Sequence, residues 1–273
     1  MRGLVRVGAA VPSLALGNVK ENMKRHLAMM REAKEKHVSI VTFPELSLTG
    51  YTCQDLFFQD SLNDAALAGL GEILNCSRLH PDVVAVVGLP VRLGCRMFNC
   101  AAVLSGGMVH GLVPKTYIPN YHEFYEKRWF SSGEDLHENQ ALLQIPGMPA
   151  QTVPVLPKAL FALADGTVFG VEICEDLWTP IPPSSILALS GAEVIVNLSA
   201  SNETIGKRAY RRELVNHQSA AAACVYAYAS AGAGESETLG LCLCCAGKRP
   251  GETFDITTNF AGKTVQPAQM RCG

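Results

Sequence analysis

The sequence predicts a layered α/β fold in which β-α-β crossovers are combined with β-hairpins. Three observations lead to this prediction: a strand, helix, strand pattern over residues 4–43, hairpin-like turns at 105–107 and 164–166, and alternating helical and β-branched runs up to residue 229. Crossovers join parallel strands, whereas hairpins join antiparallel strands. The combination therefore favours mixed sheets covered by helices over an all-parallel doubly wound sheet.

The first crossover places a carboxylate at the edge of the sheet. Residues 4–10 alternate weakly and predict a strand, and Asn18 followed by Glu21 matches the capping box of a helix. Apolar residues then recur at helical spacing, and a β-branched run at 38–43 predicts the next strand. Because such strands are parallel, residues beyond their carboxyl ends converge on one ligand-binding edge, where we expect Glu45.

The remaining elements follow from the same periodicities. We expect a helix around 62–74, a strand at 83–88, a hairpin from 98–104 and 109–113, a hairpin from 160–163 and 167–173, a helix at 184–189, a strand at 193–198, a helix at 207–222 and a strand at 224–229. The two hairpins deliver Lys115 and Cys174 just beyond strand ends. The absence of internal repeats and low-complexity linkers makes one domain the simplest organisation.

Composition excludes several classes of protein. The chain has 273 residues, 48% of them hydrophobic and 18% charged, which is enough to bury one sizeable core. A formal net charge of −2 gives no cationic field for nucleic acid. The uncharged runs at 139–157 and 214–234 are broken by prolines or open on polar residues, so no membrane span is expected. The 10 cysteines lack the spacing of a disulfide framework, which favours a cytoplasmic location.

Three residues could carry chemistry if the fold brings them together. Cys174 lies at a strand-to-turn junction, where a thiolate nucleophile can be exposed. Glu45 could act as a general base, and Lys115, bracketed by prolines, could stabilise an oxyanion. Taken singly, each has a commoner explanation: a buried inert cysteine, an exposed loop carboxylate and a solvated surface lysine. What favours a site is that an acid, an amine and a thiol each follow a predicted strand.

The order of these residues and the segments around them resemble a known family. FPELSLTGY contains Glu45, VPKTYIPNYHEFYEKRWF contains Lys115 and GVEICEDLW contains Cys174. They resemble the carbon-nitrogen hydrolase (nitrilase) superfamily, whose members use a Glu-Lys-Cys triad. NYHEFYEKRWF and NLSAS are similar to one branch, the N-terminal glutaminase domain of glutamine-dependent NAD synthetase. The resemblance covers roughly residues 3–238 and implies a four-layer α-β-β-α sandwich that assembles into homo-oligomers through its helical faces.

The resemblance also implies roles for individual residues. Cys174 would be the nucleophile, Glu45 the base and Lys115 the oxyanion partner, so that glutamine loses its side-chain ammonia through a thioester. Other positions match further active-site residues of the branch: Glu123 as an additional glutamate, and Tyr51, Tyr121, Glu175 and Ser201 as residues that hold or orient the substrate. A neighbouring base is expected to raise the thiolate character of Cys174 near neutral pH.

The chain departs from the branch in lacking the signature of its ATP-dependent domain. The Ser-Gly-Gly-x-Asp-Ser loop of that domain is absent, and the glycines at 106 and 107 are followed by Met108, which fits a hairpin turn. Gly262-Lys-Thr264 lacks the first glycine of a phosphate-binding loop, because Thr257 stands there. We therefore expect no cofactor on this chain. ATP and deamido-NAD would bind only to a synthetase domain, and that domain or a separate partner would receive the ammonia.

The similarity ends near residue 238. We expect a hydrolase domain over 1–238 and an atypical tail over 239–273, truncated or frame-shifted, which leaves the second sheet incomplete. The cluster Cys242-x-Cys244-Cys245 could instead bind a soft metal, although no second ligand pair stands at zinc spacing. A family-like continuation in another reading frame of the DNA after Thr238 would support the frame shift, and its absence from both alternative frames would exclude it.

Two alternatives to a glutaminase stay open. The same triad could serve a stand-alone amidase that acts on another small amide, which a substrate panel distinguishes. The chain could also be a catalytically silent fragment that acts only as an interaction module. Release of ammonia and selective labelling of Cys174 distinguish an enzyme from such a fragment.

Overall fold

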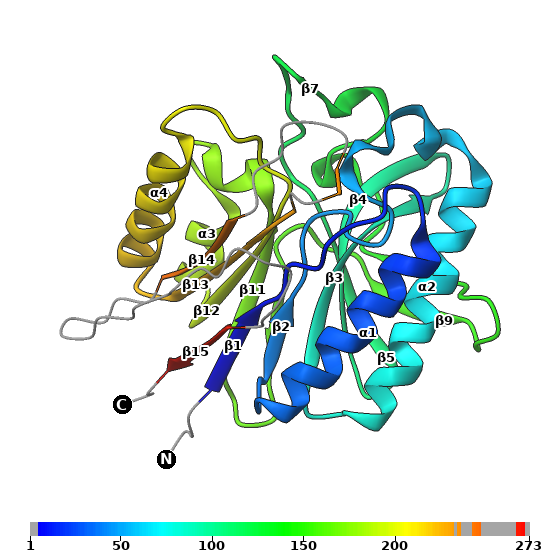
Figure 1. Ribbon diagram of the computed structural model, residues 1–273, viewed down its shortest axis with the longest axis horizontal. Coiled ribbons are helices and arrows are strands. Elements are labelled where there is room, and N and C mark those ends of the chain that lie inside the picture. Colours follow the sequence, from blue (N-terminus) through cyan, green and yellow to red (C-terminus); the bar gives the residue numbers. More distant parts are fainter. Residues whose placement is uncertain (1–4, 232–233, 236–241, 247–265, 271–273) are drawn as a thin grey trace.

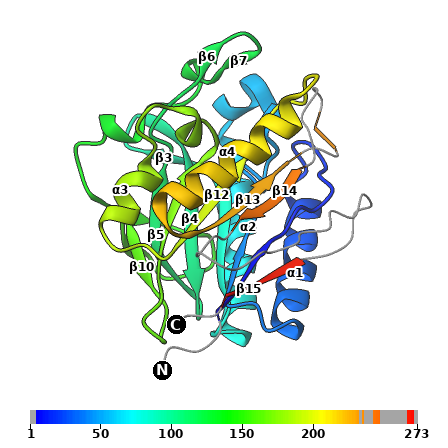
Figure 2. The same ribbon diagram turned by 90° about the vertical axis from the view of Figure 1, so that its left-hand side faces the viewer.

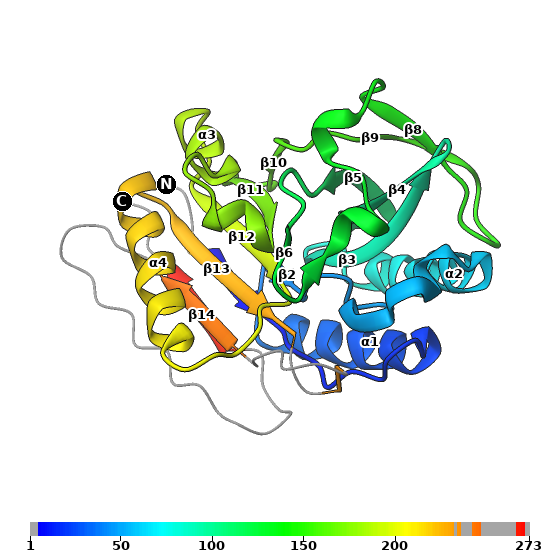
Figure 3. The ribbon, with the colours of Figure 1, turned by 90° about the horizontal axis from the view of Figure 1, so that it is seen from above.

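The computed structural model describes residues 5–231, 234–235, 242–246 and 266–270. Two sheets pack face to face, and each carries helices on its outer side (Figure 1). This is the four-layer α-β-β-α sandwich that the sequence resemblance implies. Seen from above, α1 and α2 lie on one side of the two sheets, and α3 and α4 lie on the other (Figure 3).

The first sheet has the strand order β15-β1-β2-β3-β4-β5. Its elements are β1 (Val5–Ala9), β2 (Ile40–Thr42), β3 (Val84–Leu93), β4 (Arg96–Ser105), β5 (Met108–Pro114) and β15 (Gln266–Met270), covered by α1 (Val19–Glu35) and α2 (Asp60–Leu79). Strands β1, β2 and β3 are parallel, and β3, β4 and β5 form antiparallel pairs. The apolar stripes of α1 and α2, including Met30, Leu70 and Ile73, pack against the sheet.

The second sheet has the order β10-β11-β12-β13-β14. Its elements are β10 (Leu160–Ala162), β11 (Val168–Ile173), β12 (Val194–Ser199), β13 (Val225–Ser230) and β14 (Cys242–Ala246), covered by α3 (Pro183–Leu189) and α4 (Lys207–Ala222). Helix α4 lies across β13 and β14 (Figure 2). Between the two sheets, β-branched residues such as Val7 and Ile40 meet Val171 and Val196 in a dry core.

Shorter elements surround the ends of these strands. They are the 3₁₀ helices η1 (Tyr51–Phe58), η2 (Glu126–Arg128), η3 (Gly133–Asp135) and η4 (Cys174–Trp178), the hairpin of β6 (Asn120–Tyr121) and β7 (Phe124–Tyr125), and the hairpin of β8 (Gln140–Leu143) and β9 (Gln151–Pro154). Sequence periodicity gave no indication of them, because elements of two to eight residues are too short for a repeating apolar pattern.

The expected helices, strands and hairpins are confirmed within a few residues. At the first helix, the Asn18 side chain accepts a hydrogen bond from the Glu21 backbone at 3.1 Å, which confirms the N-cap half of the predicted capping box, whereas the Asn18 backbone N–H donates to the Ala15 carbonyl at 3.0 Å and not to Glu21. Within the tail, the structure describes two short strands: β14 pairs with β13, and β15 pairs with β1. β14 and β15 have five residues each. The side chains of the Cys242 cluster and the rest of the tail lie outside the described residues.

The described part of the chain contains no helix that is both long and apolar enough to cross a bilayer.

Candidate active site

Glu45 and Lys115 form a buried ion pair. Glu45 follows β2 and Lys115 follows β5, and both side chains are completely buried. Lys115 Nζ donates to Glu45 Oε1 at 2.7 Å, and Asn99 Nδ2 on β4 donates to the same oxygen at 2.7 Å. The fold therefore brings together an acid and an amine that are 70 residues apart in sequence. Glu45 is therefore not an exposed loop carboxylate, and Lys115 is not a solvated surface lysine.

A second glutamate, Glu126, contacts Lys115 from the other side. Lys115 Nζ donates to Glu126 Oε1 at 2.7 Å, and the Tyr51 hydroxyl donates to that same oxygen at 2.7 Å. Burial by itself lowers the pKa of Lys115, yet Glu126 and Glu45 raise it well above its usual value. Burial also raises the pKa of Glu126, against the opposing effect of Lys115. The lysine is therefore a fixed ammonium ion in a water-poor site.

The glutamate that contacts Lys115 is Glu126, whereas the sequence predicted Glu123 as the additional active-site glutamate. Glu123 is exposed in the turn between β6 and β7, whereas Glu126 begins η2 and is 1% exposed. The charge of Glu123 acts on Lys207. Both glutamates belong to the segment EFYEKRWF, so sequence spacing alone could not decide between them. The structure distinguishes them, because Glu126 is buried against Lys115 and Glu123 is exposed.

Cys174 sits at the turn where β11 ends and η4 begins. Its backbone φ is +46°, in the left-handed region, and the residue is 6% exposed. A non-glycine residue rarely adopts this conformation, and such strain is common where a reactive side chain is presented. The Ala200 backbone N–H, just beyond β12, forms a hydrogen bond with the sulfur. Glu45, Lys115 and Glu126 all act on the Cys174 thiol through their charges, so the sulfur belongs to the same site.

The resting cysteine is a thiol and not a preformed thiolate. Burial raises the pKa of Cys174 well above its usual value, and the Glu45 charge raises it further. Lys115 and the Ala200 N–H act in the opposite direction without cancelling the increase. This direction is contrary to the expectation that a neighbouring base gives Cys174 thiolate character near neutral pH. The sulfur therefore needs a base that removes its proton when the substrate is present.

Asp176 holds the two reactive turns together. Its carboxylate accepts hydrogen bonds from the backbone N–H groups of Thr116 at 3.1 Å, Tyr117 at 2.8 Å and Ile173 at 3.0 Å. These donors lie on either side of the site, next to Lys115 and next to Cys174. This role was not predicted from the sequence, although the acidic pair that follows Cys174 was a visible signal.

The outer side of the site carries opposite charges. The Tyr121 hydroxyl donates to Glu175 at 2.8 Å, and burial raises the pKa of Glu175. Lys207, at the start of α4, donates to Asn202, and its ammonium lies 5.1 Å from the centre of the Trp178 ring. Burial lowers the pKa of Lys207, and its charge interacts with Cys174 and Glu175. Lys207 was not predicted from the sequence, because a lysine in a helical first turn is usually a solvated residue.

Of the four residues predicted to hold or orient the substrate, two are buried and two line a cavity. Tyr51 is buried and contacts Glu126, so it supports the ion-pair network. Ser201 follows β12, is buried, and its backbone N–H donates to the Ser230 hydroxyl at 3.2 Å. Tyr121 and Glu175 line an open cavity of about 830 Å³, together with Thr116, Asn120, Lys127 and Thr179. Glu45, Lys115 and Cys174 are not among its lining residues, so the cavity adjoins the outer side of the site only.

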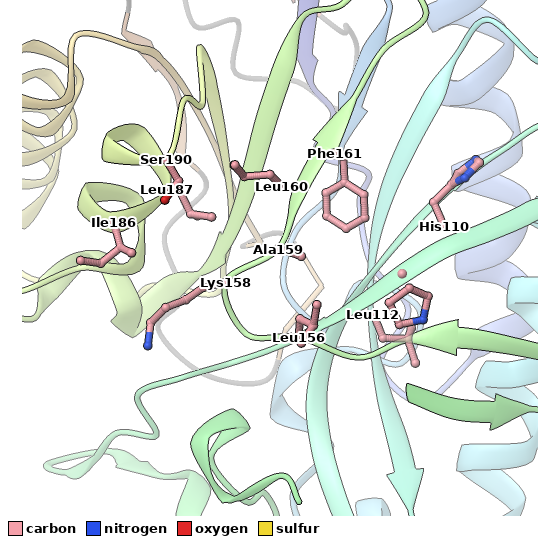
Figure 4. A pocket seen from close by; sticks show the side chains of 12 residues that line it. His110, Leu112, Leu156, Lys158, Ala159, Leu160, Phe161, Ile186, Leu187 and Ser190 are labelled. Atoms are coloured by element: carbon pink, nitrogen blue, oxygen red, sulfur yellow. The ribbon is translucent and has the colours of Figure 1, made fainter. Parts of the chain in front are cut away.

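A second cavity lies elsewhere, between β5 and α3. It has a volume of about 410 Å³ and is lined mainly by apolar side chains, among them Leu156, Leu160 and Phe161 (Figure 4). None of the predicted site residues lines it. In the described part of the chain, no three His, Cys, Asp or Glu side chains are grouped as a metal site.

Comparison with known proteins agrees with this geometry. A family model described as carbon-nitrogen hydrolase matches residues 7–248. The chain belongs to the carbon-nitrogen hydrolase family. The glutamine-dependent NAD(+) synthetase of Mycobacterium leprae is 40% identical over 226 residues, which cover 82% of this chain and 32% of that protein. The protein of the same name from Aquifex aeolicus is 30% identical, over 78% of this chain and 33% of that protein.

Solved structures show the same relationship. A glutamine-dependent NAD(+) synthetase from Cytophaga hutchinsonii superposes with a TM-score of 0.75 at 27% identity, covering 90% of this chain and 39% of that chain. A nitrilase-superfamily amidase from Nesterenkonia shares the fold, with a TM-score of 0.67 at 16% identity over 89% of this chain and 82% of the amidase. This hydrolase therefore spans about a third of the length of the curated synthetases that it matches.

Proposed function

We propose that this hydrolase cleaves the side-chain amide of glutamine through a thioester on Cys174 and releases ammonia. The observation that carries the proposal is the buried Glu45–Lys115 pair, joined at 2.7 Å, whose charges both act on the Cys174 thiol. A base, a fixed cation and a nucleophile in one water-poor site are the components that amide cleavage by covalent catalysis requires.

In the first step Glu45 takes the proton of the Cys174 thiol. Glu45 Oε1 already accepts from Lys115 and Asn99, whereas Oε2 is buried and has no hydrogen-bond partner among the residues the structure describes. An unpartnered carboxylate oxygen is available to accept that proton. The sulfur then attacks the amide carbon. Negative charge moves onto the carbonyl oxygen, where the Lys115 ammonium and the Glu175 backbone N–H stabilise it.

The second half of the reaction returns the enzyme to its starting state. The carbon-nitrogen bond breaks, the leaving nitrogen takes the proton held by Glu45, and ammonia departs from a glutamyl thioester. Glu45 next removes a proton from water, whose oxygen attacks the thioester. The carbon-sulfur bond breaks, and the sulfur recovers the proton. The sum is glutamine plus water giving glutamate plus ammonia.

The charges on the outer side favour glutamine over a simple amide. Glu175 can pair with the α-ammonium of an amino acid, and Lys207 can pair with its α-carboxylate. Both side chains are half-buried, so a matching charge on the substrate compensates for the water that they lose. A neutral amide such as propionamide satisfies neither group.

We further propose that the ammonia supplies NAD synthesis. The relatives are named glutamine-dependent NAD(+) synthetases, and this chain matches about a third of their length. A synthetase domain or a separate partner would bind ATP and deamido-NAD and consume the ammonia. A cytoplasmic location and homo-oligomeric assembly stay predictions from the sequence.

Ammonia release from glutamine by the purified chain tests the proposal. Cys174→Ala should lower the rate at least about 10⁴-fold with the fold intact, because the nucleophile is removed. Cys95→Ala is the matched control, since Cys95 is a free, exposed cysteine in the turn between β3 and β4. Faster cleavage of propionamide than of glutamine would favour the stand-alone amidase. A folded wild-type chain that releases no ammonia from either substrate would favour the silent fragment.

A further inference from the structure

Glu235 caps a 3₁₀ helix that is remote from it in sequence. Helix η1 begins at Tyr51, and the preceding residue, Gly50, has no side chain that can cap it. Glu235 Oε1 accepts the Tyr51 backbone N–H at 2.8 Å, and Oε2 accepts the Thr52 backbone N–H at 3.0 Å and the Thr52 hydroxyl at 2.6 Å. One carboxylate therefore satisfies the amides that open η1 from 184 residues away.

The backbone before Glu235 is built for this approach. Gly234 has a φ of +102°, and a Cβ atom at this position would lie 1.9 Å from the Leu14 carbonyl oxygen. Only glycine allows the chain to pass so close to Leu14 while adopting this conformation. The position of Glu235 is thus set by backbone packing and not only by the reach of a flexible side chain.

The residue that Glu235 holds belongs to the hydrolytic site. The Tyr51 hydroxyl donates to Glu126 Oε1, which also accepts from Lys115 Nζ, each at 2.7 Å. Lys115 donates in turn to Glu45 at 2.7 Å. Without the hydrogen bond from the tyrosine hydroxyl, Glu126 would attract the Lys115 ammonium more strongly. The ammonium would then move away from Glu45 and from the sulfur.

We infer that Glu235 is a positioning residue of the hydrolytic site, one that holds Tyr51 so that Glu126 shares Lys115 with Glu45. The inference deepens the proposed function and rests on it for its catalytic consequence. Glu235 touches neither the sulfur nor Lys115, so it acts through Tyr51. Its loss reduces the ability of Lys115 to stabilise the Cys174 thiolate and the oxyanion.

Glu235→Gln is the informative substitution, because it keeps the shape and puts an amide N–H₂ group opposite backbone N–H donors. We expect iodoacetamide to alkylate Cys174 about 5-fold to 10-fold more slowly, with the rate followed by peptide mass spectrometry from pH 6 to 10. With glutamine, kcat should fall by a similar factor at nearly constant KM.

Glu193→Gln is the matched control. Glu193 is also a half-buried carboxylate that accepts a backbone N–H, from Val168 at 3.1 Å, but it lies at the opposite end of β11 from Cys174. We expect its alkylation rate to stay within 2-fold of wild type. If Glu235→Gln leaves the chain unfolded, Thr52→Val replaces it. That variant removes one hydrogen bond to Glu235 and should slow alkylation about 2-fold to 3-fold.

A double-mutant cycle with Tyr51→Phe decides between positioning and a general structural effect. If Glu235 acts through the tyrosine hydroxyl, its substitution should add no further slowing in the Tyr51→Phe background. Multiplied effects, or a folded Glu235→Gln chain that is alkylated at the wild-type rate, would overturn the inference. Because alkylation needs no glutamine turnover, absence of ammonia release would refute the proposed function while the alkylation data still test Glu235.

Discussion

The inner and outer sides of the site differ in how their charges are held. On the inner side, Glu45, Lys115 and Glu126 are at most 1% exposed and share short hydrogen bonds. On the outer side, Tyr121 is 48% exposed, and Glu175 and Lys207 are only half-buried. This difference in burial suits the two groups of charges to different tasks. Permanently dry charges can stabilise charge that develops during the reaction, whereas partly solvated charges can exchange water for a substrate.

The strongest test of the inner side is Lys115→Met. Removing the ammonium leaves two buried carboxylates without their cation, so we expect the free energy of unfolding to fall by about 3–5 kcal/mol. Glutamine hydrolysis should fall about 1,000-fold, because the oxyanion loses its charged partner. Urea unfolding and ammonia release measure the two effects. Lys115→Met combined with Glu126→Gln should recover part of the stability but none of the activity. A fully stable single variant would show that the pair is not desolvated.

Lys207→Met tests the outer side. We expect kcat/KM for glutamine to fall about 10-fold to 100-fold, which corresponds to one lost charge-assisted hydrogen bond. Any cleavage of propionamide should change less than 2-fold, because this substrate has no carboxylate. Steady-state kinetics with both amides makes the comparison. Equal losses for both substrates would show that Lys207 supports the fold or the chemistry and does not select the substrate.

His26 contacts Ser47, in the turn that carries Glu45, and makes the free energy of unfolding depend on pH. Its ring accepts from or donates to the Ser47 hydroxyl at 2.9 Å, and burial lowers its pKa to about 4. Because the folded pKa lies below the unfolded value, the folded state binds fewer protons, and stability falls as pH decreases. We expect His26 to account for a loss of about 2 kcal/mol of unfolding free energy between pH 7 and pH 5.

Urea unfolding of His26→Gln at both pH values isolates this contribution. The variant should lose that part of the pH dependence, whereas His217→Gln, a change at an exposed position of α4, should keep all of it. An unchanged slope in His26→Gln would assign the pH dependence to the buried carboxylates.

The smallest effect is expected at the exposed Asp55–Arg128 pair, which links η1 to η2. Arg128 Nε donates to Asp55 at 2.7 Å, but both side chains are more than half exposed. Asp55→Asn should therefore change the free energy of unfolding by less than about 1 kcal/mol and kcat by less than 2-fold. A fall in kcat comparable with that of Glu235→Gln would mean that the Asp55–Arg128 pair and Glu235 hold η1 equally.

The sequence predicted the inner side of the site better than its surroundings. Glu45, Lys115 and Cys174 each follow a regular strand, and the resemblance to the hydrolase family singled them out; the structure brings them together. Glu126 could not be distinguished from Glu123, because the chain between β6 and η2 is irregular and burial there depends on the rest of the fold. Asn99 was missed for a related reason: it lies inside a β-strand, where a polar residue carries no sign of the partner across the sheet.

The raised pKa of Cys174 has a consequence for durability. Peroxide oxidises thiolates far faster than thiols. Under the proposed mechanism, a sulfur that keeps its proton until an amide binds should resist sulfenic acid formation in the resting protein. Cys174 should then be most open to oxidation in the interval when it is deprotonated and not yet acylated.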